Sequence, residues 1–499
     1  MNGVPPPPDS NSRMTRLGRS VLHLGVGQAI STALGFVLLV AVGRALGPSD
    51  IGTLYAVATI YGFVAVLIDW GQSTYVIREI ASGRCNEAEF IGASLMTRLI
   101  GNLGAAIVGT AAAHFLGYDG STVLLVALAT LIGLPGSLAA LFGFVFRGKD
   151  RMDLDVLIGL VGKLLSVAAA IAVLALGGGI LEIVAATSVG SIASLILAVR
   201  LLLRFRIQGK LPESKLVREL FWVGTPLAMM SFSMGLQPFV DMTVLSLLTG
   251  PAVVGWLGIS RIILGIFLAP AGILAAATFP ELSRAAVSVP NLHQILSSAA
   301  RITLAVSAFA ASALFIFADT GVSLTYGAGK FNQVVVLLQV TSPFLPLFFL
   351  NFLVANAVFA LRKMVVVAVI KVLLVAIGAI VSWFAVSYFD NKFGNGAIGI
   401  IVSYGSTETL MLVAMLSLLP TAAIDSKILL YLVRAYVTFG AVVLGAAILP
   451  TLPVPISVPI FGLAFAVAGV ATRLILVSDI VRAFSFMKST IKNRTRGLS

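Results

Sequence analysis

The chain has 499 residues, of which 59% are hydrophobic and only 11% are charged, and its mean hydropathy is +1.06. Soluble domains carry roughly a quarter charged residues, so this composition excludes a soluble protein. Apolar runs of about twenty residues, each long enough to cross a bilayer core, recur along the chain, whereas a membrane β-barrel would show short alternating segments. The sequence therefore predicts an all-α polytopic membrane protein.

Fourteen apolar segments are expected to cross the membrane, with boundaries uncertain by about two to four residues. The expected spans are Leu22–Val42, Gly52–Ile68, Ile91–Leu116, Val123–Phe146, Val156–Leu176, Ile180–Leu203, Phe221–Leu248, Val253–Phe279, Ile302–Ala318, Val334–Leu361, Met364–Tyr388, Ala397–Leu419, Ile428–Leu449 and Ile456–Val477. The tenth is expected to be broken, because it contains Pro343 and Pro346.

A short motif recurs between two pairs of apolar runs. Gly47-Pro48 is followed by Gly52, and about two hundred residues later Gly250-Pro251 is followed by Gly255 at the same spacing. Such an echo indicates two homologous halves, which is a common way to build a carrier. The expected organisation is a disordered cytoplasmic tail at 1–20, an N-lobe at 21–204, a linker at 205–220, a C-lobe at 221–420, two further helices at 421–478 and a basic tail at 479–499.

Lysine and arginine gather in one set of connections. The N-terminal tail, the connections from even to odd spans and the C-terminal tail hold most of them, whereas the opposite connections hold little more than Arg44, Lys330 and Lys392. The positive-inside rule then predicts that both termini are cytoplasmic. This bias accounts for the formal charge of +13, so no nucleic-acid partner is needed to explain it.

Sequence signatures of catalysis are absent. The run Gly327-Ala328-Gly329-Lys330 lacks the first glycine of a phosphate loop, because position 324 is leucine. The three histidines are scattered, and the single Cys85 cannot form an internal disulfide or a cysteine metal cluster. The expected outward-facing loops are also short. We therefore expect a carrier without enzymatic activity, bound metal or cofactor.

Basic residues inside the spans cost a few kcal/mol each at the bilayer centre, so they are candidates for function. Arg98, Lys163, Arg261 and Lys371 are the candidate anion-binding set. Arg261 lies deepest and is expected to face a water-filled cavity. For the other three, a cavity-facing position and snorkelling to the inner headgroups stay open as alternatives.

Acidic residues inside the spans are candidates for coupling to a cation. Glu408 lies among small and hydroxyl residues, and either binds H⁺ or Na⁺ or forms a structural ion pair with a neighbouring basic residue. Asp241 follows Gln237 and Pro238, so it is a second coupling candidate or a partner of Arg261 across the helical hairpin. Asp69 is expected to cap or orient the loop after its span.

Several motifs together resemble the bacterial polysaccharide-export flippases of the multidrug/oligosaccharidyl-lipid/polysaccharide exporter superfamily. The matching residues, in chain order, are Gly43-Arg44-Ala45-Leu46-Gly47-Pro48, Gly52, Tyr55, Asp69-Trp70-Gly71, Arg78-Glu79-Ile80-Ala81, Gly224-Thr225-Pro226-Leu227, Asp241, Gly250-Pro251, Gly255, Phe279-Pro280-Glu281-Leu282-Ser283-Arg284, Tyr326-Gly327, Phe331 and Ala360-Leu361-Arg362-Lys363. The resemblance implies two six-helix lobes in a V around a central cavity, with two additional C-terminal helices.

The resemblance also implies a function in cell-surface polysaccharide biosynthesis, such as that of O-antigen or exopolysaccharide. The expected substrate is undecaprenyl-diphosphate-linked oligosaccharide, moved from the cytoplasmic to the outer leaflet of a bacterial inner membrane with H⁺ or Na⁺ coupling. Polysaccharide polymerase and chain-length proteins are possible partners beside the membrane lipids. The alternatives are a peptidoglycan-precursor flippase, a drug/cation antiporter and a non-transporting subunit of a polysaccharide-assembly complex.

Overall fold

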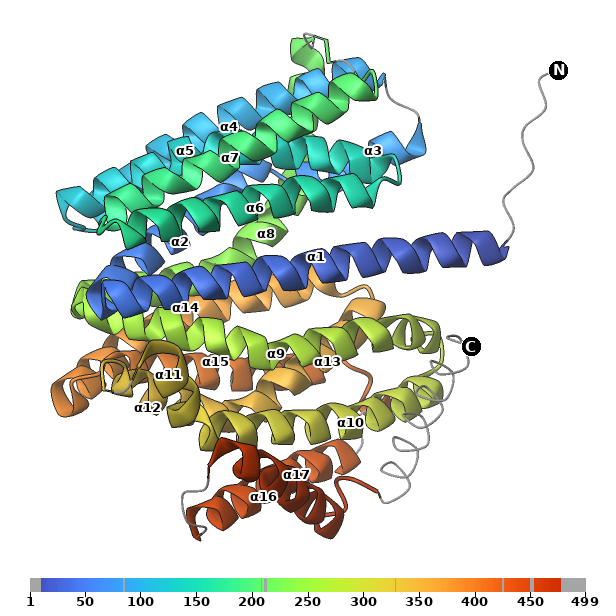
Figure 1. The fold of residues 1–499 in the computed structure, drawn as a ribbon. Coiled ribbons are helices and arrows are strands. Elements are labelled where there is room, and N and C mark those ends of the chain that lie inside the picture. Colours follow the sequence, from blue (N-terminus) through green and yellow to red (C-terminus); the bar gives the residue numbers. More distant parts are fainter. Residues whose placement is uncertain are drawn as a thin grey trace, which may run out of the picture. The chain divides into compact units, whose positions relative to one another are not determined.

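The computed structural model describes residues 10–83, 86–207, 209–210, 213–327, 329–423, 426–448 and 453–476, and these contain helices and connecting turns but no strand (Figure 1). The helices are α1 (Ser10–Ala45), α2 (Pro48–Asp69), α3 (Gln72–Ser82), α4 (Glu87–Phe115), α5 (Gly120–Gly148), α6 (Met152–Ala175), α7 (Ile180–Arg204), α8 (Ser214–Leu248), α9 (Pro251–Ala285), α10 (Val289–Ile316), α11 (Ala318–Tyr326), α12 (Asn332–Thr341), α13 (Leu345–Ala360), α14 (Met364–Phe393), α15 (Ala397–Ser417), α16 (Ser426–Ile448) and α17 (Val454–Ala471). The short 3₁₀ turns η1 and η2 cover Ser342–Phe344 and Thr421–Ala423. The predicted all-α class is confirmed.

The chain forms two compact units, Met1–Gly255 and Trp256–Ser499. In the first unit α4, α5, α6 and α7 run alongside one another, while α1 packs on α6 and α8 packs on α2 and α4 (Figure 1). In the second unit α10 packs against α13 and α16, and α14 forms a hairpin with α15. The boundary between the units falls inside α9. The division into lobes joined by a linker at 205–220 stays a prediction.

Twelve helices of the described residues are long and apolar enough to span a membrane, and two shorter apolar helices cover Gly235–Leu248 and Pro455–Ala471. Each of the fourteen predicted spans overlaps a helix, but the seventh and the fourteenth have only these shorter apolar stretches, so the count of fourteen stays a prediction. The shorter apolar stretch of the seventh contains Gln237 and Asp241. Pro343 and Pro346 accompany η1 between α12 and α13, so the predicted break in the tenth span is confirmed.

Helical structure extends beyond the predicted boundaries. Helix α1 begins at Ser10, inside the predicted disordered tail, and α8 begins at Ser214, inside the predicted linker. Helices α3 and α11 were not expected; α3 follows a sharp turn in which Trp70 and Gly71 both have left-handed backbone angles. Residues 1–9, Cys85 and the basic tail at 479–499 lie outside the described residues.

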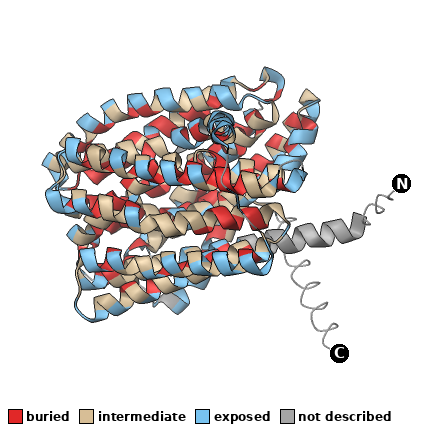
Figure 2. Cartoon of the chain, turned by 90° about the horizontal axis from the view of Figure 1, so that it is seen from above, coloured by how far each residue is buried: buried red, intermediate tan, exposed pale blue. Residues whose placement is uncertain are grey.

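Buried residues form stripes along the helices, and many exposed positions between them are large and apolar (Figure 2). Leu103 is 65% exposed and Phe115 is 86% exposed, for example. In water such a surface would be unfavourable, but lipid chains are as apolar as leucine side chains, so in a bilayer no partner is needed to cover it. The exposed apolar surface thus agrees with the membrane protein that the composition predicts.

Candidate functional site

A polar cluster in the second unit joins three helices. The carboxylate of Glu408 on α15 accepts a hydrogen bond from Nδ2 of Asn351 on α13 at 2.7 Å. Its other oxygen lies 2.5 Å from the ammonium of Lys371 on α14. The side chain of Glu408 is only 10% exposed and that of Lys371 is 23% exposed. Since buried charges are normally paired, this arrangement explains how both are accommodated in an apolar bundle.

Small residues along the α14–α15 hairpin place this ion pair. Helix α14 ends at Phe393, and Gly394 directly after it has a left-handed φ of 64°, which reverses the chain. At Gly399 an added Cβ would meet the backbone of α14, and Ser403 donates a hydrogen bond to the carbonyl of Gly378 at 3.0 Å. Such contacts let two membrane helices approach closely. Further along the same hairpin, the ammonium of Lys371 pairs with the carboxylate of Glu408.

An aromatic residue of the same cluster faces two cations. Tyr404 precedes Glu408 by one helical turn, and its ring centroid lies 5.9 Å from the guanidinium carbon of Arg261 and 5.8 Å from the ammonium of Lys371. Phe348 packs against Tyr404 at 5.1 Å between ring centroids. The cluster therefore brings two positive charges and one carboxylate close to one aromatic ring.

A second network, in the first unit, surrounds Arg98. Its guanidinium donates to Asp69 at 2.6 Å, to the carbonyl of Ser137 at 2.7 Å and to the side chain of Gln72 at 3.4 Å. Arg98 is only 3% exposed. The carboxylate of Asp69 also accepts from the hydroxyl of Ser73 at 2.8 Å, so the expectation that Asp69 orients the segment after its span is confirmed. Arg98 thus ties α4 to α5 and to the α2–α3 turn.

The remaining predicted site residues have other surroundings. Lys163 is half-buried on α6 near Gly35 of α1, and its amine makes no hydrogen bond or ion pair with any described residue. Asp241 is 1% exposed and accepts a hydrogen bond from Gln237 at 3.0 Å. Its proposed pairing with Arg261 stays a prediction. Of the six predicted site residues, the structure brings Arg261, Lys371 and Glu408 together.

The sequence prediction missed several polar partners. Asn351 is one of two amides in the apolar helix α13, the other being Asn356, and an amide in such a helix is the signal that could have singled it out. Tyr404 lies one turn from Glu408, so helical spacing could also have found it. No comparable local signal connects Gln72 or Ser137 with Arg98, because these contacts join residues far apart in the sequence.

The cluster around Glu408 also contains an oxygen suited to a small cation. The Oδ1 atom of Asn351 is buried and has no hydrogen-bond partner, while Nδ2 of the same amide is bound to Glu408. Carboxylate and amide oxygens are ligands that hard cations prefer. The described residues contain no group of three or more His, Cys, Asp and Glu side chains that could hold a metal ion.

Comparisons with known proteins define the class. A multidrug-resistance MATE family transporter of the MOP superfamily in its inward-facing conformation has a TM-score of 0.63 at 17% identity, covering 84% of this chain and 98% of its own. The lipid II flippase MurJ in an inward closed conformation has a TM-score of 0.68 at 15% identity, covering 92% of this chain and all of its own. The chain thus has the fold of MOP-superfamily membrane proteins.

The family follows from a sequence match. The family described as "Polysaccharide biosynthesis protein" matches residues 17–286, which is more than half of the chain. The chain belongs to this family, as the motifs between Gly43 and Arg284 predict. Among curated protein sequences, none matches the chain significantly.

Proposed function

We propose that the protein is a flippase that moves undecaprenyl-diphosphate-linked oligosaccharide from the cytoplasmic to the outer leaflet of a bacterial inner membrane. The family match carries this proposal, because it assigns the chain to polysaccharide biosynthesis. The fold shared with a lipid II flippase supports it, since that protein is named for moving a lipid-linked precursor. The chemistry of the candidate site adds a physical reason.

The cluster around Tyr404 is the proposed diphosphate site. A diphosphate carries several negative charges, and Arg261 and Lys371 supply charge-assisted hydrogen-bond donors around one ring. The partial burial of Lys371 strengthens such an interaction, because fewer water molecules screen it. Lys163, which makes no ion pair with a described residue, stays a candidate anion-binding residue of the first unit. Arg98 is a weaker candidate, since its guanidinium is already engaged by Asp69 and Ser137.

The proposed coupling step acts on the ion pair between Lys371 and Glu408. A proton or Na⁺ bound at Glu408 replaces Lys371 as its partner, and the free amide oxygen of Asn351 supplies a second ligand for Na⁺. Such binding drives transport only if the two access states bind the cation with different affinity. Asp241, deeply buried beside Gln237, is the alternative coupling carboxylate.

The decisive experiment measures the lipid-linked sugar pool of a deletion strain complemented with variants. Without the protein, undecaprenyl-linked oligosaccharide is expected to accumulate and surface polysaccharide to disappear. Arg261→Ala is expected to reduce complementation at least tenfold, whereas Arg200→Ala, at an exposed position on α7, serves as the matched control. Normal lipid-linked and surface pools in the deletion strain would refute the proposal, and altered drug sensitivity would then favour the antiporter alternative.

A further inference from the structure

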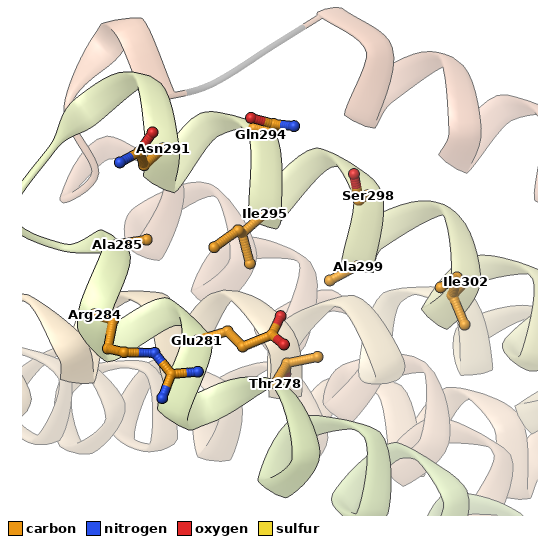
Figure 3. Close-up of a pocket in the computed structure, with 10 residues that line it drawn as sticks. All are labelled: Thr278, Glu281, Arg284, Ala285, Asn291, Gln294, Ile295, Ser298, Ala299 and Ile302. Carbon is orange, nitrogen blue, oxygen red and sulfur yellow. The ribbon is translucent and has the colours of Figure 1, made fainter.

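A pocket in the second unit lies between the last turns of α9 and the first turns of α10 (Figure 3). Its volume is about 650 Å³, and pockets that bind small molecules typically measure roughly 300–1,000 Å³. Glu281 and Arg284 line it from α9, and Asn291, Gln294 and Ser298 line it from α10. The α10 residues recur at three- and four-residue spacing, so they share one face of that helix.

All five of these polar side chains are exposed. Among the described residues, none of the five makes a hydrogen bond, ion pair or ring contact through its side chain. This contrasts with Glu408, Asp69 and Arg98, which are all bound to neighbours. Apolar side chains, including Ile295 and Ile302, complete the wall beside the polar groups (Figure 3). The pocket thus combines exposed polar groups with an apolar wall, a mixture that ligand sites also have.

The chemistry of the lining selects a ligand class. Glu281 offers only acceptors, Arg284 offers only donors, and the amides of Asn291 and Gln294 offer both. A multiply charged anion is disfavoured by Glu281, and a cation by Arg284. Sugar rings fit better, because every hydroxyl is both donor and acceptor and the C–H faces of the ring are apolar.

We infer that this pocket binds the sugar portion of the lipid-linked oligosaccharide, separately from the cluster around Tyr404 that takes the diphosphate. The inference rests on the proposed function. The connection from α9 to α10 is one of those that the positive-inside rule assigns to the cytoplasm, the side on which the proposed substrate is collected. Recognition of the sugar there selects the substrate before it is moved.

The test uses the full-length protein in lipid nanodiscs and a probe without diphosphate. The probe is the free oligosaccharide released by mild acid from the lipid-linked pool of the deletion strain. Asn291→Ala combined with Gln294→Ala is expected to weaken its binding at least tenfold. Two controls are expected to retain binding: Asn332→Ala removes an exposed amide on α12, and Glu408→Gln/Lys371→Met changes the cluster around Tyr404 without leaving an unpaired charge.

Each outcome has one meaning. Unchanged binding by the double variant, with a normal lipid-linked pool accumulating in the deletion strain, overturns the sugar pocket and leaves the proposed function intact. Failure of that pool to accumulate refutes the proposed function and the inference together. If glycerophosphoethanolamine binds and depends on Asn291 and Gln294 while the oligosaccharide does not bind, the pocket is a site for phospholipid headgroups and the inference is wrong.

Discussion

Glu408 and Lys371 form an ion pair whose members are mostly shielded from solvent, so removing one charge leaves the other without compensation. We predict that Glu408→Gln lowers stability by about 3 kcal/mol, within the usual range for breaking a buried pair. The double variant Glu408→Gln/Lys371→Met is expected to recover most of this loss, because neither charge then remains. The midpoint of thermal unfolding in detergent, together with the amount of protein in the membrane, measures both effects.

The double variant also separates structure from transport. It is expected to reach the membrane in normal amounts yet to fail in complementation, since both proposed ligand groups are absent. A double variant no more stable than Glu408→Gln alone would show that the two side chains do not interact energetically. Normal transport by Glu408→Gln would remove Glu408 from the coupling step and leave Asp241 as the candidate.

We expect that lysine cannot replace Arg98 without loss of stability. Its guanidinium donates to Asp69, Ser137 and Gln72 in three directions, and a lysine ammonium lacks this planar fork. We predict that Arg98→Lys destabilises the protein by roughly 2 kcal/mol, because acceptors in a partly buried site are left without a partner. Arg200→Lys, at an exposed position, should have no measurable effect on thermal stability. Equal midpoints for Arg98→Lys and wild type would contradict this role.

At the residue scale the sequence predicted which groups are unusual but not which groups they contact. The rarity of charge inside apolar spans was sufficient to select Arg261, Lys371 and Glu408. Pairing of Glu408 with a basic neighbour stood as one of two interpretations, and the structure supplies Lys371 as that neighbour. The partners of Arg98 come from helices brought together by packing, and periodicity along one helix carries no information about such contacts.

At the scale of elements, the two copies of the glycine–proline motif pack reciprocally within the first unit. A Cβ added to Gly52 on α2 would meet the carbonyl oxygen of Pro251, and one added to Gly255 on α9 would meet that of Pro48. Backbone atoms cannot move aside as a flexible side chain can. We predict that Gly52→Ala lowers stability by about 1–3 kcal/mol, the usual effect of overpacking, measured by thermal unfolding in detergent.

A matched control is available on the same helix. Gly62 of α2 has no atom within 4 Å of an added Cβ, and alanine is the better helix former, so Gly62→Ala should be neutral or slightly stabilising. Equal destabilisation by both substitutions would indicate a general effect on α2 rather than a close helix contact.

The start of α5 depends on Asp119. Its carboxylate accepts hydrogen bonds from the hydroxyls of Ser121 and Thr122 and from the backbone amide of Thr122, and these bonds hold the pKa of Asp119 below its ordinary value of 3.8. Asp119→Ala is expected to cost about 1 kcal/mol, typical for loss of an N-cap. Because the folded pKa is lowered, this contribution is present above pH 3.8 and is lost as the pH falls through the folded value.

Thermal unfolding at pH 7 and at pH 3 tests this cap. The difference in unfolding midpoint between wild type and Asp119→Ala should be present at pH 7 and smaller at pH 3. The midpoint of Asp119→Asn should stay closer to that of wild type at pH 7, because asparagine also caps helices. A difference that does not depend on pH would contradict the role of the ionised carboxylate.

Hydropathy predicted the positions of the long helices but not their ends or the short helices. Helix α3 is amphipathic, so a search for apolar runs passes over it, and α11 has only 9 residues. The two glycine–proline motifs were found as a sequence echo. Their contact was not predicted, because the echo gives equivalence between segments and not their arrangement in space.

At the scale of the whole molecule, composition alone fixed the class, and the family motifs pointed to the fold that the solved relatives share. The division into an N-lobe and a C-lobe stays a prediction. The boundary between the two compact units lies inside α9, a helix that is continuous in sequence, so hydropathy carries no signal for it. The substrate and the coupling ion depend on a few side chains, so they remain proposals.

The orientation of the whole chain in the membrane can be tested with its only cysteine. The positive-inside rule places the connection containing Cys85 in the cytoplasm, so a membrane-impermeant maleimide is expected to label it in inside-out vesicles and not in right-side-out vesicles. The matched control is Cys85→Ser/Lys330→Cys, whose cysteine lies at an exposed position between α11 and α12 and should show the opposite pattern. Labelling of Cys85 from outside would reverse the predicted topology. It would also place the pocket between α9 and α10 on the outer face, where it could receive the sugar after transport but could not select it before.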